Sequence, residues 1–326
     1  MLQLGLLNLS HPCVSAPMAG VSDLPFRVIA RRFGAPLAFT EMIDARALSH
    51  KDRRTLHMLS SGEKDRPLGV QLVGNDEKYL LKAMEVLEGY EFDLLDLNAA
   101  CPAPKLAKKG MGAGLLREPA RLESLLEMMV QRSRVPVTVK IRSGWDGGSL
   151  NAMEVAQRAC NAGVSALFIH GRTKVQGYSG AVDYGVIRDV KNASPVPVIA
   201  SGDNISLAAV MKTFEETNCD GVAIARGSLG NPWIFRDIIG FFEKPVSDHD
   251  EVGAGEVVEV MRDHLDMVID HYGEKKGVSC FRKFFIWYTR GLKGVKPYRD
   301  LAFRAVTRDD LHEVMEEVRT LRRLSL

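Results

Sequence analysis

A cysteine and a proline follow one short apolar strand of this chain, in a position suited to chemistry. The strand expected over residues 93–98 ends in Asn98, and Cys101-Pro102 comes three residues later. Proline stops a strand and stiffens the turn, so we expect the Cys101 thiol at the strand's carboxyl end rather than in a core. In a parallel α/β protein, that end is where the reactive groups usually lie.

The same pattern recurs seven more times, because a polar or glycine-rich turn follows each short apolar run. Any one of these residues alone is more often a loop-anchoring hydrogen bonder than a ligand contact. Lys140 is harder to dismiss, because a lysine flanked by apolar strand residues must be solvated or paired. In chain order the strand ends carry Pro17-Met18, Glu41, Gln71, Asn98 with Cys101, Lys140 with Arg142, His170 with Arg172, Ser201-Gly202-Asp203, and Arg226-Gly227.

The last two turns have the composition of a phosphate site. Residues 201–204 and 225–228 each place a glycine where backbone amides can approach an anion. Barrel enzymes often bind phosphate between the loops that follow their seventh and eighth strands. The alternative is a pair of ordinary tight turns, and the two readings are about equally well supported.

The elements that position these residues form eight strand–helix units. Segments 23–33, 119–134 and 151–162 have helical spacing, and most of the strands are continuous apolar runs typical of a parallel sheet. Eight units in roughly 240 residues is the size of a (β/α)8 TIM barrel. The expected strands cover residues 13–17, 37–41, 68–73, 93–98, 136–142, 165–170, 196–201 and 219–225.

A doubly wound sheet is the rival fold. It would normally carry a GxGxxG turn after its first strand, and this chain has none. The nearest match is a GxGxG at residues 110–114, inside a basic loop. The sequence therefore favours the barrel.

The pattern changes at residues 243–256, where proline, glycine and acids cluster. We expect a barrel domain over 1–242, a linker over 243–256 and a helical domain over 257–326, with helices at 256–272 and 307–323. Residues 274–304 carry nine lysines and arginines against two acids, interleaved with aromatics. This composition is typical of a nucleic-acid surface, although a solvated helix over an aromatic core would look the same.

Composition is that of a soluble enzyme, with 46% hydrophobic and 26% charged residues. No apolar run approaches the roughly 20 residues that cross a membrane. The five cysteines are scattered without a CxxC pair, which indicates a reducing cytoplasm and no metal site. The net charge of +2 means that a polyanionic partner must meet a local patch.

Seven motifs resemble those of the tRNA-dihydrouridine synthases, with the bacterial B subgroup closest. The resemblance spans about residues 10–300, and the Cys-Pro, HGRT and GxxGNPWIF stretches are its most specific parts. The motifs are APMAGVSDLPFR (16–27), TEM (40–42), LDLNAACP with GAGLL (95–102 and 112–116), VKIRSGWD (139–146), IHGRT (169–173), ASGD (200–203) and ARGSLGNPWIF (225–235).

The resemblance implies an FMN-binding barrel followed by a helical domain that holds tRNA. Cys101 would be the catalytic proton donor, and Asn98, Arg142 and Arg172 would contact the substrate. The basic patch of the second domain would bind tRNA through Lys293, Lys296 and Arg299. The implied FMN contacts are Pro17, Met18, Ala19, Gln71, Lys140, His170, Ser201, Gly202, Asp203, Ala225 and Arg226.

The implied reaction is NADPH-dependent reduction of a D-loop uridine to 5,6-dihydrouridine. FMN would supply a hydride to C6 and Cys101 a proton to C5, since a free thiol is mostly protonated near neutral pH. The expected partners are tRNA and NAD(P)H, with no membrane, no metal and a monomeric chain.

Three residues depart from the family pattern. Ala100 stands where glycine usually precedes Cys-Pro, Ser201 replaces the usual asparagine, and Ala225 replaces glycine before Arg226. All three are small, so we expect adjusted turns and retained activity, provided that neither alanine needs a positive φ.

Two other functions fit parts of the sequence. One is another FMN-dependent barrel oxidoreductase acting on a small molecule, which would have no use for the basic aromatic segment. The other is an RNA-binding scaffold without catalysis, which bound flavin that oxidises NADPH would exclude.

Overall fold

A computed structural model of the chain describes residues 1–244 and 252–321. These residues form two compact units, one of Met1–Asp23 with Ala35–Arg226 and the other of Leu24–Gly34 with Gly227–Leu326. The predicted linker at 243–256 falls in the second unit's part of the chain, and its residues 245–251 lie outside the described residues.

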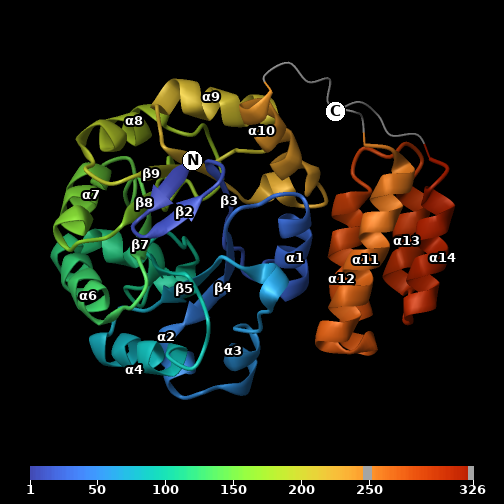
Figure 1. Cartoon of the computed structure of the whole chain (residues 1–326), viewed down its shortest axis with the longest axis horizontal. Coiled ribbons are helices and arrows are strands. Elements are labelled where there is room, and N and C mark those ends of the chain that lie inside the picture. Colours follow the sequence, from blue (N-terminus) through green and yellow to red (C-terminus); the bar gives the residue numbers. More distant parts are fainter. Residues whose placement is uncertain (245–251, 322–326) are drawn as a thin grey trace. The chain divides into compact units, whose positions relative to one another are not determined.

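The first unit is a closed barrel of eight parallel strands, which confirms the predicted TIM barrel (Figure 1). The strands pair in the order β10-β3-β4-β5-β6-β7-β8-β9. Their bounds are β3 Cys13–Ser15, β4 Ala38–Asp44, β5 Leu68–Val73, β6 Leu94–Asn98, β7 Val137–Arg142, β8 Ala166–His170, β9 Val198–Ser201 and β10 Gly221–Ile224.

Helices follow the strands and cover the outside of the barrel (Figure 1). Asp76, Asp183 and Ser206 cap three of them by accepting backbone N–H bonds from the first turn. The barrel helices are α2 Ala45–Ser49, α3 Arg53–His57, α4 Glu77–Leu87, α5 Pro104–Ala107, α6 Pro119–Arg132, α7 Ala152–Asn161, α8 Tyr184–Ala193 and α9 Leu207–Thr217.

Strand register brings the polar residues together at one end of the barrel. Asn98 pairs with Lys140 across β6 and β7, and Arg142 pairs with His170 across β7 and β8. His170 in turn pairs with Ser201 across β8 and β9. Because the strands are parallel and closed, their carboxyl ends meet at one rim.

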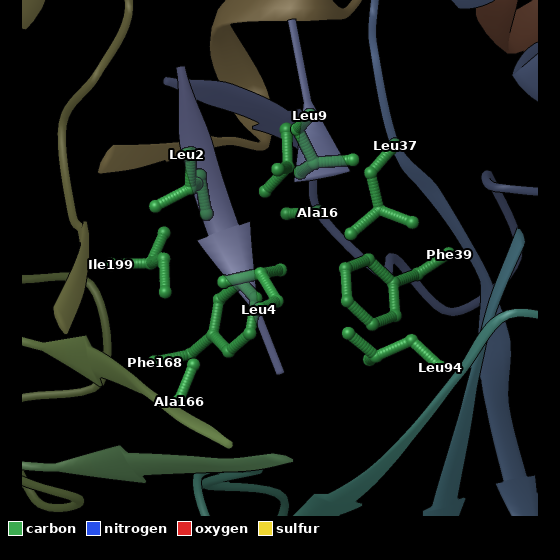
Figure 2. Close-up of a cluster of buried hydrophobic side chains, with 12 residues drawn as sticks. Leu2, Leu4, Leu9, Ala16, Leu37, Phe39, Leu94, Ala166, Phe168 and Ile199 are labelled. Atoms are coloured by element: carbon green, nitrogen blue, oxygen red, sulfur yellow. The ribbon is translucent and has the colours of Figure 1, made fainter. Parts of the chain in front are cut away.

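The opposite end of the barrel is closed by a hairpin that the sequence analysis did not anticipate. Strands β1 (Leu2–Leu4) and β2 (Leu7–Leu9) pair antiparallel. Their leucines pack into a buried cluster with Phe39, Phe168 and residues at the strand starts (Figure 2). The Phe39 and Phe168 rings meet edge to face, with centroids 5.5 Å apart. This apolar floor leaves the carboxyl end as the side open to ligands.

The second unit is helical, as the C-terminal part of the sequence predicted. It includes α1, the helix between β3 and β4 in the chain, and α10, although the predicted barrel domain of residues 1–242 had contained α1 and nearly all of α10. Its helices are α1 Leu24–Arg32, α10 Trp233–Glu243, α11 Ala254–Tyr272, α12 Glu274–Tyr288, α13 Lys296–Arg304 and α14 Arg308–Val318. No helix among the described residues has the length and apolar character needed to span a membrane.

A buried histidine sits at the centre of the aromatic core of this unit. His264 is fully buried, and its ring lies 4.5 Å from that of Phe284 and 5.3 Å from that of Phe281. Its Nδ1 shares a hydrogen bond of 3.1 Å with the Tyr288 hydroxyl, while its Nε2 has no partner among the described residues. Burial, with Lys283 adding to it, lowers the pKa of His264 from 6.5 to about 3.

Acid should therefore destabilise the helical unit through His264. The native imidazole stays neutral down to about pH 3, whereas the unfolded chain takes up a proton below about 6.5. The free energy of unfolding is unaffected by protonation of His264 above pH 6.5. Below that pH it falls by up to about 1.4 kcal/mol per pH unit. Urea unfolding between pH 8 and 5 should show a shallower loss in His264→Gln, and equal slopes would contradict this.

Candidate active site

A cavity of about 400 Å³ opens at the carboxyl ends of the barrel strands. Its size is within the range of small-molecule and cofactor sites. The lining residues that the sequence analysis had singled out are Pro17, Met18, Ala19, Gln71, Asn98, Cys101, Lys140, Arg142, His170, Ser201, Gly202, Asp203, Ala225 and Arg226.

The Cys101 turn is held in place by three sets of contacts. Asn98 Oδ1 accepts hydrogen bonds from the backbone N–H groups of Ala100, at 3.0 Å, and Cys101, at 2.8 Å. Arg142 Nε donates to the Ala100 carbonyl at 2.6 Å. The Cys101 carbonyl accepts from Ala113 N at 3.1 Å. The half-buried thiol is therefore held in the cavity wall.

Gly112 is needed for this close approach of chain segments. Its φ is +56°, and a Cβ built there would lie 2.9 Å from the Cys101 carbonyl oxygen. A larger residue would push the segment that carries Ala113 away from the turn. The GAGLL motif thus contributes a packing surface for the cysteine.

Lys140 belongs to β7 and lines the cavity. Its Nζ donates to Ser201 Oγ at 2.8 Å, and Ser201 Oγ donates to the Ile169 carbonyl at 3.2 Å. Burial and the nearby Arg142 lower the pKa of Lys140 to about 8, while Asp96 opposes that shift. Lys140 is therefore a cation in the cavity wall below that pH. Ser201, which replaces the family's usual asparagine, supplies a neutral partner for it.

Arg142 joins the Cys101 turn to the loop after β8. Besides Ala100, its guanidinium bonds through Nη1 to the carbonyls of Thr173, at 3.0 Å, and Gly177, at 2.9 Å. Arg142 is 2% exposed, and its guanidinium also lies 5.8 Å from the centroid of the Tyr178 ring. Its predicted contact with substrate stays a prediction.

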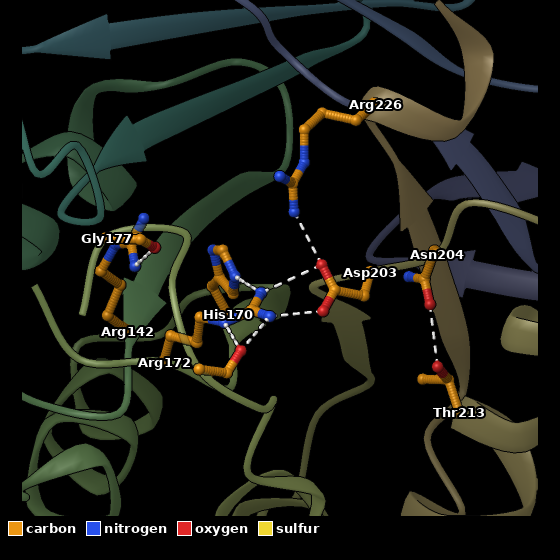
Figure 3. A network of polar contacts seen from close by, with 9 residues as sticks. Arg142, His170, Arg172, Gly177, Asp203, Asn204, Thr213 and Arg226 are labelled. Carbon is orange, nitrogen blue, oxygen red and sulfur yellow. Dashed lines mark hydrogen bonds and ion pairs between the residues drawn. The ribbon is translucent and has the colours of Figure 1, made fainter.

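Arg172, Asp203 and Arg226 form an ion network beside the cavity (Figure 3). Arg172 donates two hydrogen bonds to Asp203 and two more to the Gly180 carbonyl. Arg226 donates to the same carboxylate at 2.7 Å. The hydrogen bonds from Arg172 are the main cause that lowers the pKa of Asp203.

Arg172 itself is not among the residues that line the cavity, so its predicted substrate contact stays a prediction. Asp203 has a φ of +52°, which is uncommon for a residue with a side chain, although aspartate adopts it more readily than most. His170 is buried beside these cations. Burial first, and then Lys140 and the arginines, lower the pKa of His170 to about 2, so its imidazole is neutral.

Tyr178 lines the cavity, although the sequence analysis missed it. The residue is 61% exposed, and the Arg226 guanidinium lies 4.9 Å from the centroid of its ring. Gly177 and Gly180 flank it with φ of +59° and +72°. An aromatic between two glycines after the HGRT motif was the only clue in the sequence.

Residues 14–324 match the family model described as dihydrouridine synthase. The chain belongs to this family. It is 37% identical over 300 residues to tRNA-dihydrouridine synthase B of Pseudomonas aeruginosa, covering 91% of this chain and 89% of that protein. It is 35% identical over 306 residues to tRNA-dihydrouridine synthase B of Pasteurella multocida, covering 94% and 92%.

Among solved structures, histamine dehydrogenase from Rhizobium sp. 4-9 matches with a TM-score of 0.57 at 14% identity. The match covers 82% of this chain and 50% of the dehydrogenase chain. At this identity the likeness concerns the barrel fold alone.

The two alanines that depart from the family pattern fit their turns. Among non-glycine residues that the structure describes, only Lys51, Asp203 and Asn218 have a positive φ. Ala100 and Ala225 therefore replace glycine without backbone strain, as the sequence analysis assumed.

The residues predicted to bind tRNA lie in the helical unit. Lys293 and Lys296 are exposed, whereas Arg299 is half-buried. Arg299 Nη2 donates to the Thr289 carbonyl at 3.1 Å and so caps the end of α12. Loss of Arg299 would affect both charge and local structure.

Replacing Arg142 with methionine should destabilise the barrel, because three backbone carbonyls, two of them buried, lose their donor. We expect the free energy of unfolding to fall by about 1–3 kcal/mol, measured by urea denaturation. Arg226→Met is the matched control, since its side chain is 45% exposed and its ion pair should contribute about 0–1 kcal/mol. Equal effects would contradict the structural role of Arg142.

Proposed function

We propose that this protein reduces uridine to 5,6-dihydrouridine in the D-loop of tRNA, with FMN as bound cofactor and NADPH as reductant. The observation that carries the proposal is the Cys101 thiol, held by Asn98 and Arg142 in the wall of the cavity. Family membership and the names of the two relatives support the reaction and its tRNA substrate.

The residues of the cavity fit FMN. Ala16, Pro17 and Met18 supply an apolar wall for a flat ring. Lys140 and Arg226 supply positive charge for the anionic parts of the cofactor. A Cβ at Gly202 would lie 2.9 Å from His170 Cδ2, so this turn has room only for glycine next to the ring of His170.

Within this set, Gln71, Lys140 and His170 would border the ring, and residues 201–203 with Ala225 and Arg226 would hold the ribityl chain and phosphate. Arg226 already binds the Asp203 carboxylate. A phosphate would compete with that carboxylate for the guanidinium, since both are bidentate acceptors. His170 is neutral and so adds no charge to the site.

When bound, FMN supplies the hydride that reduces C6 of the uracil. The chain's own residues then complete the reaction. Cys101 Sγ gives its proton to C5 as general acid. Asn98 and Arg142 fix the backbone that carries this thiol. The ammonium group of Lys140 favours negative charge on whatever occupies the cavity beside it.

A uridine in folded tRNA must leave its stack to enter a cavity of this kind. The exposed ring of Tyr178 offers a face on which a base or its neighbour can stack. Its contact with Arg226 keeps that ring beside the cavity.

Cys101→Ala should separate the two halves of the reaction. FMN binding and NADPH oxidation should stay near wild type, because the thiol acts only after the cofactor is reduced. Dihydrouridine formation in a tRNA transcript, measured by mass spectrometry, should slow by about 10²–10⁴-fold.

Cys160→Ala is the matched control, since Cys160 is another half-buried thiol, on α7 and outside the cavity. Wild-type dihydrouridine formation in Cys101→Ala would contradict the role of the thiol. A flavin-loaded protein that oxidises NADPH but leaves tRNA unmodified would favour a small-molecule substrate instead.

We further propose that Lys293 and Lys296 contact tRNA phosphates. Replacing both with alanine should weaken tRNA binding and reduce the slope of log affinity against log salt by about two units, one for each lost contact. Filter binding at several salt concentrations measures this slope. Arg299→Ala belongs in a separate variant, because Arg299 also caps α12.

Lys78→Ala with Lys82→Ala is the control, because it removes two exposed lysines from α4 on the barrel. The control should bind tRNA as wild type does. If the Lys293 and Lys296 variant also binds normally at every salt concentration, the phosphate contacts must be sought around Lys105, Lys108 and Lys109.

A further inference from the structure

A buried chain of polar side chains runs through the barrel and ends at the Cys101 turn. It begins at Thr138 on β7, whose hydroxyl donates to Asp96 Oδ1 at 2.7 Å. Gln71 Nε2 on β5 donates to the other oxygen, Asp96 Oδ2, also at 2.7 Å. Asn98 Nδ2 then donates to Gln71 Oε1 at 2.8 Å. All four side chains are buried, at 6% exposed or less.

Strand register builds this chain of contacts. Gln71 lies beside Asp96 across β5 and β6, and Asp96 lies beside Thr138 across β6 and β7. Asn98 stands two residues after Asp96, on the same face of β6. Three neighbouring strands therefore contribute one continuous hydrogen-bonded path to the turn.

The path has a direction, and Asp96 sets it. The amide ends of Gln71 and Asn98 have nearly the same shape, so packing alone does not decide which end points where. An ionised carboxylate can only accept hydrogen bonds. Gln71 must then turn its NH₂ toward Asp96 and its carbonyl toward Asn98.

Asn98 in turn must direct its NH₂ to Gln71, which leaves its carbonyl for the turn. That carbonyl is the atom that accepts from the N–H groups of Ala100 and Cys101. A reversed Asn98 would face two N–H donors with its own NH₂, and the turn would lose both bonds. The orientation at Cys101 thus depends on an acceptor two side chains away.

We propose that Asp96 is a positioning residue for Cys101, acting through Gln71 and Asn98 to hold the turn that carries the thiol. Asp96 lies too deep to touch substrate, since it is 1% exposed and absent from the cavity lining. The role of the Cys101 thiol as proton donor rests on the proposed function. The position of the Cys101 turn depends only on the folded chain.

A purely structural role for Asp96 would make different demands. A buried carboxylate needs hydrogen-bond donors for its oxygens, and for a purely structural role any set of donors would be enough. Burial raises the pKa of Asp96 to about 6, and the bonds from Thr138 and Gln71 oppose that shift. If Asp96 instead acts by orienting Gln71, a neutral side chain that offers the same acceptor oxygen should be able to replace it.

Two substitutions at this position separate the roles. In Asp96→Asn, the new carbonyl can accept from Gln71 while the new NH₂ donates to the Thr138 hydroxyl, so the direction is kept without the charge. In Asp96→Leu, the acceptor is lost and Gln71 is free to reverse. Both variants are tested as the purified full chain, without tRNA.

The first readout is amide hydrogen exchange of a peptide spanning residues 98–102. The second is the rate of alkylation of Cys101 by iodoacetamide, followed by peptide mass spectrometry with Cys160 as internal reference. In Asp96→Leu we expect both rates to change by at least about fivefold relative to wild type, the factor for one lost hydrogen bond. In Asp96→Asn both should stay within about twofold of wild type, since the bonds of the turn are kept.

Wild-type exchange and alkylation in a folded Asp96→Leu would overturn the proposal. So would equal losses in both variants, because charge rather than direction would then hold the turn. If circular dichroism shows Asp96→Leu unfolded, Gln71→Leu breaks the path one step nearer the turn and takes the same readouts. Neither readout depends on dihydrouridine formation, so failure of the proposed reaction would leave this result distinct.

Discussion

Closure of the parallel strand ladder is the constraint on which the rest of this protein depends. Each strand must pair with its neighbours in one register, so its last polar residue meets those of the adjacent strands. Residues as far apart in the chain as Pro17 and Arg226 thereby line one cavity. The hairpin of β1 and β2 closes the other end with leucines and leaves one open face. The position of the site follows from the topology.

The protonation states of the side chains around the cavity depend on their burial as well as on their residue types. Lys140 and Arg142 both have lowered pKa values because they are buried, and their charge helps keep His170 neutral. Asp96 and Asp203 supply the opposite charge at two depths, one inside the barrel and one at the cavity. The wall therefore stays net cationic with a neutral imidazole, which suits an anionic cofactor better than a cationic one.

The barrel and most of the cavity could be predicted from the sequence because both depend on local patterns. An apolar run followed by a polar turn identifies a strand and its end, and the closed ladder then brings the strand ends together. The hairpin at residues 2–9 was missed because three-residue strands carry too little pattern. Tyr178 was missed because it sits in a glycine-flanked loop, and no strand end points to it. The membership of α1 in the helical unit depends on long-range packing, which a single sequence does not reveal.

The contacts of three arginines could not be predicted from the sequence. The family resemblance implied substrate contacts for Arg142 and Arg172, and the basic composition of residues 274–304 suggested a tRNA contact for Arg299. Each of these guanidinium groups binds backbone or carboxylate oxygens of its own unit. A guanidinium has five donors, so holding the fold and contacting a ligand are compatible. At Arg142 the two roles converge, because the carbonyl of Ala100 that it holds belongs to the Cys101 turn. With Ala100 in place of glycine and no positive φ there, that turn keeps its shape through side-chain hydrogen bonds rather than through backbone freedom.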